Sequence, residues 1–232
     1  MGATSIIGGA TGFGAALIAT PLMLLIGFPL PQVIVLNLTV ALVTRIAIAV
    51  QLRRNIQWRR VGLLGLGSVP GSWLGAATVT SLPMVYFQPA VGILVMLCGV
   101  AMMLPTSGKT YTPSTLTLTL TGGISGYLGT TTSLNGPPPA LLLMRARLPP
   151  LTFIADLAGF FIIANTAALA IMWMANAITL DMVWPSLPVL LSTALVGNSC
   201  GIWIARKMTS EAFRFVTISL VIASGALAVL HN

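Results

Sequence analysis

Two charged side chains inside long apolar stretches are the first candidates for chemistry in this sequence. Arg45 lies seven residues before Leu52, and Asp156 lies seven residues after Pro149. At 1.5 Å per helical residue, each lies about 10 Å from one end of its stretch, so the two can share a depth and could form a pair. Charges in such segments indicate function by default. Arg45 either binds an anion or snorkels to the membrane surface, and Asp156 either takes up a proton or only pairs with Arg45.

Two glycine- and proline-rich interruptions supply the second set of candidates. The first runs from Gly12 through Thr20 to Pro21, and the second runs from Gly126 through Gly129 to residues 135–139. Proline fits the first turn of a helix and not its interior. Each interrupted stretch is therefore predicted to be two half-helices, the second of which begins at the proline. A helix N-terminus presents unpaired N–H groups and partial positive charge, which favours a bound anion.

Hydroxyl, amide and glycine residues around these interruptions complete the candidate anion site. Asn37 and Asn165 lie at matching depth and either line a pathway or hydrogen-bond across helices. For each Ser or Thr the alternative role is to cap a helix or to join two helices. The candidate binding residues are Thr11, Gly12, Phe13, Gly14, Thr20, Pro21, Asn37, Arg45, Ser125, Gly126, Tyr127, Ser133, Asn135, Gly136, Pro137 and Asn165.

The sequence offers no set of residues for metal binding or covalent catalysis. His231 is the only histidine, and the two cysteines, Cys98 and Cys200, lie in separate apolar stretches. Nucleophilic catalysis needs a nucleophile with a base or a metal, so we expect no enzymatic activity, no metal and no cofactor. The net charge of +8 comes from basic residues in short loops with no aromatic–basic patch, so we expect no nucleic-acid binding.

The composition determines which elements must position these residues. Of 232 residues, 56% are hydrophobic and only 6% are charged, where soluble proteins carry roughly a quarter. This excludes a soluble enzyme and a disordered chain. Continuous apolar runs predict an all-α polytopic protein of the cell (inner or plasma) membrane, in contact with the lipid bilayer. The eight predicted apolar segments are 5–28, 32–52, 61–80, 87–104, 115–144, 149–175, 182–205 and 213–230.

Repeated motifs divide the chain into two homologous halves. The pattern Gly-Gly-x-x-Gly-aromatic occurs at residues 8–13 and again at 122–127. Gly71-x-x-x-Gly75 is matched by Gly197-x-x-x-Gly201, and these pairs are predicted to be close-packing positions within a protomer or between the protomers of a homodimer. The predicted repeats are 1–104 and 115–232, joined by a linker over 105–114.

The basic loops predict that the second half is inverted relative to the first. Arg53, Arg54, Arg59 and Arg60 place their loop in the cytoplasm. If all eight segments crossed the membrane, five of the ten loop charges would lie outside. If 5–28 and 115–144 are re-entrant hairpins, each half crosses three times, all ten charges lie inside and both termini lie outside the cytoplasm. The alternative for each hairpin is a kinked spanning helix.

The sequence resembles the sulfite exporter TauE/SafE family. The resemblance is carried by Gly-Gly-Ala-Thr-Gly-Phe-Gly at 8–14, Thr-Pro-Leu at 20–22, Asn-Gly-Pro-Pro at 135–138 and the Arg-Arg-x-x-x-Trp-Arg-Arg loop at 53–60, and it covers nearly the whole chain. The resemblance implies a transporter linked to the export of sulfite or small organosulfur anions.

The expected function is therefore the export of a small sulfur-containing anion, such as sulfite or an organosulfonate. We expect the anion to bind between the N-termini of the two second half-helices near the membrane midplane, as in other inverted-repeat transporters. Protons are the candidate coupling ion, through Asp156. Two alternatives remain at this point: an anion channel or uniporter with the same site, and an accessory subunit of a membrane complex.

Overall fold

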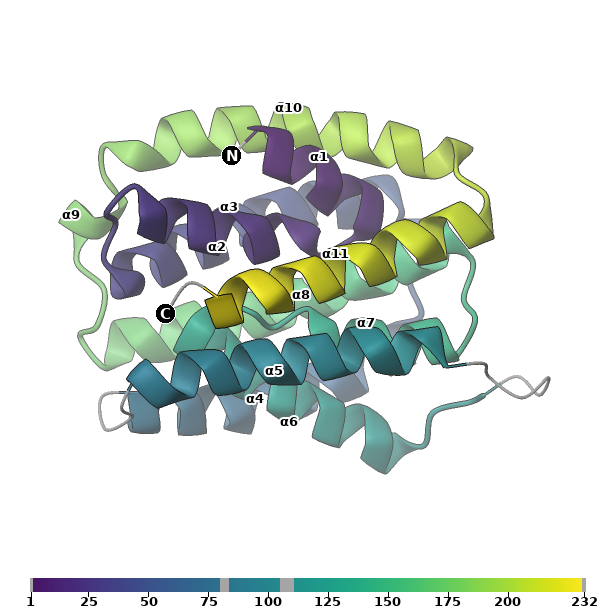
Figure 1. The fold of residues 1–232 in the computed structure, drawn as a ribbon, viewed down its shortest axis with the longest axis horizontal. Coiled ribbons are helices and arrows are strands. Elements are labelled where there is room, and N and C mark those ends of the chain that lie inside the picture. Colours follow the sequence, from purple (N-terminus) through teal and green to yellow (C-terminus); the bar gives the residue numbers. More distant parts are fainter. Residues whose placement is uncertain (1, 80–83, 105–110, 231–232) are drawn as a thin grey trace.

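The computed structural model describes residues 2–79, 84–104 and 111–230, and in these ranges the chain is all-helical (Figure 1). A short 3₁₀ helix, η1 (Arg53–Asn55), follows the third α-helix. The α-helices are α1 (Gly2–Thr11), α2 (Gly14–Leu25), α3 (Leu30–Gln51), α4 (Trp58–Thr78), α5 (Met84–Met103), α6 (Thr115–Thr132), α7 (Pro137–Arg145), α8 (Pro150–Met174), α9 (Leu180–Val183), α10 (Ser186–Lys207) and α11 (Ser210–Leu230).

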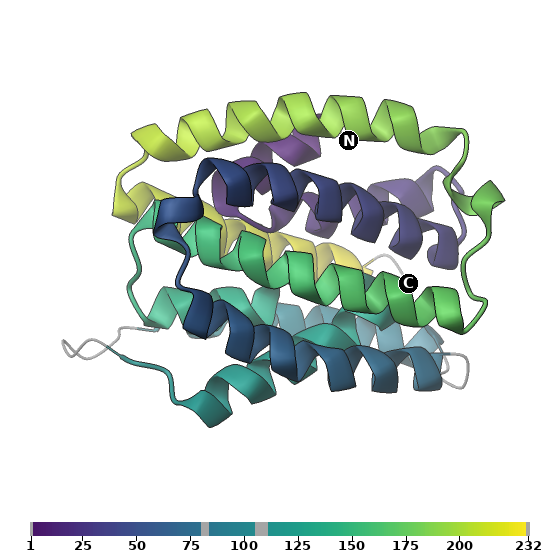
Figure 2. The same ribbon diagram turned by 180° about the vertical axis from the view of Figure 1, so that it is seen from behind.

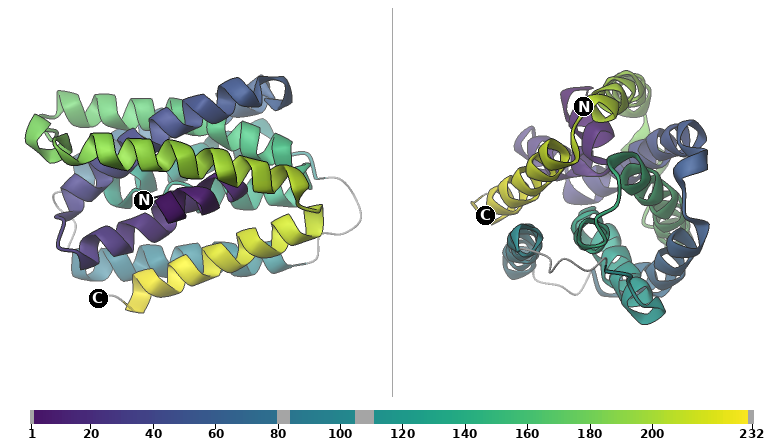
Figure 3. Two further views of the ribbon diagram at one scale, coloured as in Figure 1. Left: turned by 90° about the horizontal axis from the view of Figure 1, so that it is seen from above. Right: turned by 90° about the vertical axis from the view of Figure 1, so that its right-hand side faces the viewer.

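Long apolar helices make up most of the bundle, as the composition predicts. In the described part of the chain, α3, α8, α10 and α11 are long and apolar enough to cross a membrane. Helices α4 and α5, of 21 and 20 residues, occupy the two other segments predicted to cross. The long helices run roughly along one direction, and Figure 3 shows them nearly end-on. These observations agree with a multi-pass membrane protein.

The core of the bundle is centred on α8. This helix lies between α3 and α4, as Figure 2 shows from behind. Phe153, Ile154, Leu157 and Phe160 of α8 are almost fully buried. A helix that is hydrophobic all round is buried in a protein core or spans a membrane. Half of the most apolar window of α8 is buried by other parts of the protein.

Glycine-lined contacts join helices that are distant in sequence. Helix α4 packs along α6, and α10 packs along α1. Gly71 of α4 lies against the backbone of Gly123, and Gly201 of α10 lies against the backbones of Ile6 and Gly9. Small residues let membrane helices approach this closely, so the predicted close-packing role of the Gly-x-x-x-Gly pairs is confirmed within the protomer.

The first predicted hairpin breaks earlier than its proline. Helix α1 ends at Thr11 and α2 begins at Gly14, while Pro21 lies inside α2. The prediction that the second half-helix begins at Pro21 is therefore wrong. Gly12 takes the left-handed conformation, with φ of +89°, which glycine adopts at little cost. The Thr11 hydroxyl then accepts a hydrogen bond from the Gly14 N–H at 3.2 Å, so a local cap starts α2 at once.

The second predicted hairpin breaks where its prolines begin. Helix α6 ends at Thr132, residues 133–136 form the break, and α7 starts at Pro137, which confirms the predicted start. The predicted interruption at Gly126 and Gly129 is wrong, because both lie within α6. Gly126 faces the backbone of Ser68 in α4. Its lack of a side chain therefore allows α6 to pack closely against α4, and it does not interrupt the helix.

Candidate functional site

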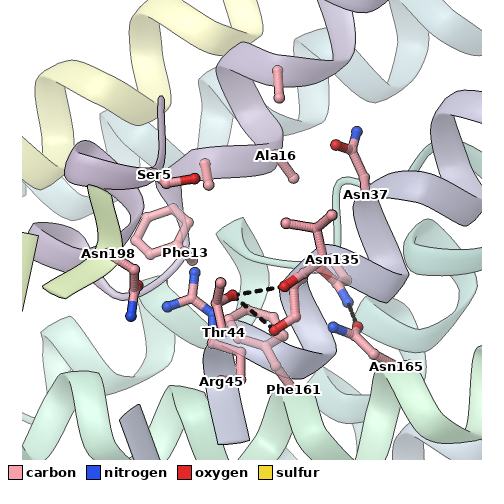
Figure 4. A pocket seen from close by; sticks show the side chains of 14 residues that line it. Ser5, Phe13, Ala16, Asn37, Thr44, Arg45, Asn135, Phe161, Asn165 and Asn198 are labelled. Atoms are coloured by element: carbon pink, nitrogen blue, oxygen red, sulfur yellow. Dashed lines mark hydrogen bonds between the residues drawn. The ribbon is translucent and has the colours of Figure 1, made fainter. Parts of the chain in front are cut away.

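Side chains from both halves of the sequence line one small cavity between the two breaks (Figure 4). About 30 Å³ of it is available to water-sized molecules, which is room for a water or two. Helices α1, α2, α3, α8 and α10 contribute to its wall, together with both breaks. The lining residues are Ser5, Phe13, Ala15, Ala16, Ala19, Asn37, Val40, Ala41, Thr44, Arg45, Asn135, Phe161, Asn165 and Asn198.

Arg45 is the charged residue of this lining. It is only 3% exposed, which contradicts snorkelling to the surface. Its Nη1 donates to the carbonyl oxygen of Gly8 at 3.4 Å, and its guanidinium lies 5.6 Å from the centre of the Phe161 ring. Its Nε has no hydrogen-bond partner among the described residues. A buried guanidinium in this state has unused donors and no acidic neighbour in the lining.

Asp156 lies apart from Arg45, so the predicted pairing of the two is wrong. The Asp156 carboxylate is fully buried, with Oδ2 2.8 Å from Nη1 of Arg60 and Oδ1 accepting a hydrogen bond from the Gln57 N–H at 2.7 Å. Five residues separate Asp156 from Phe161, against which Arg45 lies, and that is a rotation of about 140° around α8. The two charges therefore lie on different faces of α8. Asp156 binds α8 to the start of α4.

The second break forms a hydrogen-bonded network with α2, α3 and α8. The Thr20 hydroxyl lies 3.0 Å from the Ser133 hydroxyl and accepts a hydrogen bond from Nδ2 of Asn37 at 3.0 Å. Nδ2 of Asn135 donates to Oδ1 of Asn165 at 2.8 Å. Asn37 and Asn165 therefore each line the cavity and each make a hydrogen bond to another element, as the second predicted role requires. Their role in lining a transport pathway stays a prediction.

The starts of α2 and α7 present different donors. At α2 the Gly14 N–H is capped by Thr11, and the next two residues, Ala15 and Ala16, line the cavity. A helix leaves the N–H groups of its first turn without partners in its own backbone. At α7 the first three residues are prolines, which carry no N–H, and the Ala140 N–H bonds to the Gly136 carbonyl oxygen. The first turn of α2 therefore carries backbone N–H groups, while the first three residues of α7 carry none.

The other predicted residues surround the cavity or lie away from it. Thr11, Gly12 and Gly14 shape the first break, and the Ser125 hydroxyl donates to the Asn135 carbonyl oxygen in the second. Further away, in the contact between α4 and α6, are Gly126, which lies against Ser68, and Tyr127, whose hydroxyl accepts from Thr78 at 3.2 Å. Pro21 lies within α2, and Pro137 begins α7.

The two breaks touch each other at Phe13 and Gly136. A Cβ atom added to Gly136 would lie 2.6 Å from Cδ2 of the Phe13 ring. Phe13 is 4% exposed, so its ring has little room to move. Sequence reasoning predicted that the breaks approach each other, and this contact is the point at which they do.

Three polar lining residues, Ser5, Thr44 and Asn198, were missed by sequence reasoning. Asn198 of α10 is 3% exposed, and its side chain has no hydrogen-bond partner in the described part of the chain. An amide in the middle of an apolar segment was the available signal. This signal was overlooked because Asn198 adjoins Gly197, and the Gly197-x-x-x-Gly201 packing motif was sufficient to explain residues 197–201.

Comparison with known proteins gives one match. The sequence model of the family described as sulfite exporter TauE/SafE matches residues 1–228. No curated protein and no solved structure matched the chain.

Proposed function

The chain belongs to the sulfite exporter TauE/SafE family and is thus a multi-pass membrane transporter and not an enzyme. From this premise we propose that it exports sulfite or an organosulfonate-like anion through the cavity between the two helix breaks. The anion would bind beside Arg45. The cavity has room for only a water or two, and this supports a carrier that must open and close around its substrate.

The buried charge of Arg45 is the observation that carries the proposal. An unpaired ion in a low-dielectric site is strongly unfavourable, and buried charges are normally paired. Arg45 has a carbonyl oxygen and an aromatic ring as its neighbours, with no carboxylate in the lining. A bound anion would supply the missing counter-charge and would accept from the unused guanidinium donors.

The two breaks would contribute to anion binding in different ways. The first would offer the N–H groups of Ala15 and Ala16 at the positive end of α2. The second would offer amide groups, because Asn135 and Asn165 hold each other at the cavity wall. The proposal thus keeps the anion between the breaks and replaces the expected pair of helix N-termini by one.

We also propose that the chain consists of two inverted repeats, 1–104 and 115–232. Reciprocal packing supports this. The helix in the third apolar segment of each proposed repeat, α4 or α10, packs along the first helix of the other repeat, α6 or α1. Helices α3 and α8 pair with each other, and so do α5 and α11. Inversion would place all ten loop charges in the cytoplasm and both termini outside. Of the proposed linker, residues 105–110 with Lys109 lie outside the described residues.

Proton coupling through Asp156 stays a prediction. Its carboxylate contacts Arg60 and the Gln57 N–H, and these contacts favour a role in holding the start of α4. Homodimer formation likewise stays a prediction.

The test is sulfite flux into and out of proteoliposomes, with and without a pH gradient, against sulfate and chloride. Losing one partner of a buried charged contact costs about 2–5 kcal/mol, so Arg45→Gln should lower flux about 30-fold or more. Arg54→Gln, on exposed η1, is the matched control and should leave flux unchanged. Both variants must elute as folded protein. Wild-type flux in Arg45→Gln would contradict the proposed site.

A further inference from the structure

The cavity contains one positive charge and no negative charge in its described lining. Arg45 of α3 supplies the charge. The lining residues from α1, α2, α8, α10 and both breaks are neutral. Asp156, the acid of α8, faces Arg60 and Gln57 on another side of that helix. A bound substrate therefore has to balance a single positive charge, that of Arg45.

The surroundings of Arg45 make this balance decisive. The Arg45 side chain is only 3% exposed, and Phe13, Phe161 and small side chains of α2 lie in the cavity wall. Charges that are not balanced in such a low-dielectric space are strongly disfavoured. An anion with one negative charge leaves the filled site neutral, while a dianion leaves it with an excess negative charge that nothing in the lining compensates.

The hydrogen-bonding groups of the lining also suit a singly charged oxyanion. Asn37 gives its Nδ2 to Thr20, so its Oδ1 is left as an acceptor at the cavity. Asn198 presents an unpartnered carboxamide, 3% exposed, with one donor and one acceptor side. A dianionic oxyanion offers only acceptors and would meet these carbonyl oxygens unfavourably. A protonated oxyanion has an O–H that can donate to one of them.

Building on the export function proposed above, we propose that the Arg45 cavity selects the singly charged form of its substrate, hydrogen sulfite or a monoanionic organosulfonate, and rejects sulfite and sulfate dianions. When hydrogen sulfite is the cargo, one proton crosses the membrane on the substrate itself. No protein carboxylate is then needed to carry that proton, in keeping with the engagement of Asp156 by Arg60.

The protonation of sulfite itself provides the test, because its second proton is lost near neutral pH. Flux is measured in proteoliposomes with equal pH on both sides, after subtraction of flux in protein-free liposomes. The KM for total sulfite should rise about tenfold per pH unit once the dianion predominates, because only the singly charged form binds. Methanesulfonate stays singly charged, so its inhibition constant against this flux should be the same at every pH. Sulfate should not inhibit the flux.

Two variants sharpen the test. Asn198→Lys adds a second cation at the cavity, so sulfate should become an inhibitor and the rise of KM with pH should flatten. Asn198→Gln keeps a neutral amide and should retain the wild-type pH profile. If Asn198→Lys does not fold, Thr44→Lys places the second cation about one turn from Val40 and two turns from Asn37 on the same lining helix.

The outcomes separate this inference from the function beneath it. A KM for total sulfite that stays constant or falls as pH rises, or inhibition by sulfate as strong as that by methanesulfonate, would overturn monoanion selection and leave export intact. Folded protein that moves no sulfite at any pH would overturn the proposed function and, with it, the selection. The inference is supported if the KM for total sulfite rises with pH and sulfate does not inhibit the flux.

Discussion

The two helix breaks each interrupt one of the two predicted hairpin segments, but they are built differently. The first is two residues long and depends on a glycine at positive φ, with one threonine cap. The second is four residues long, is followed by the three prolines that begin α7, and is held by hydroxyl and amide side chains. The first break therefore depends mainly on backbone conformation and the second on hydrogen bonds between side chains. Two halves of similar sequence pattern can complete one site with different chemistry.

The contact between the breaks should be the most sensitive point of this comparison. Gly136→Ala places a Cβ against the rigid Phe13 ring, and such overpacking costs typically about 1–3 kcal/mol. We expect a loss near the upper end, measured by SDS unfolding in mixed micelles. Phe13→Leu combined with Gly136→Ala should recover part of it. Equal losses in the single and double variants would mean that the breaks do not press on each other.

Removing an amide from the second break should come next. Asn135→Ala leaves Oδ1 of Asn165 without its buried donor, at a cost of about 1–3 kcal/mol. We expect about 2 kcal/mol of lost stability and weaker sulfite transport. Asn135→Asp is the control, because aspartate has nearly the same shape as asparagine and should preserve the packing of the break. It also places a negative charge beside the site, so sulfite transport should fall further than in Asn135→Ala.

Straining the glycine of the first break should have a smaller effect. Gly12→Ala puts a Cβ on a residue with φ of +89°, and the left-handed conformation costs roughly 1–2 kcal/mol for a residue with a side chain. Gly62, in an open position on α4, gives a matched control, because a Cβ there meets nothing within 4 Å. If Gly12→Ala and Gly62→Ala have the same stability, the first break does not require its glycine.

Giving the second break a backbone donor should have the smallest effect. Pro137→Ala restores an N–H at the first position of α7, where helices leave such groups unpaired anyway. We expect a change in unfolding free energy within about 0.5 kcal/mol and unchanged sulfite flux. A marked gain in sulfite affinity would show that α7 can act as α2 is proposed to do.

The sequence was sufficient for the long helices and for one of the two breaks. Continuous apolar runs gave α3, α8 and α11 within a few residues, because length and hydropathy determine such elements. Pro137 marked the start of α7 because three consecutive prolines have no place inside a helix. Pro21 misled the same reasoning, since a single proline removes one hydrogen bond and α2 keeps the rest.

The site was predictable in its residues more than in its pairings. Polar residues in apolar segments pointed to Arg45, Asn37 and Asn165, and all three line the cavity. Depth alone suggested that Arg45 pairs with Asp156, but depth ignores rotation around the helix, and the turn of α8 separates them. Asn198 reached the cavity only because α10 packs along α1, a contact that no local pattern encodes.

The packing of α1 along α10 has a consequence for how the chain is made. About 175 residues separate the end of α1 from the start of α10, and a ribosome needs roughly 10 to 35 seconds to add them at 5–20 residues per second. During synthesis the face of α1 that carries Gly9 therefore lies beside the translocation machinery or in lipid until its partner, α10, has been made. Because Asn198 of α10 is part of the lining, the site around Arg45 is complete only after α10 has been synthesised and has packed along α1.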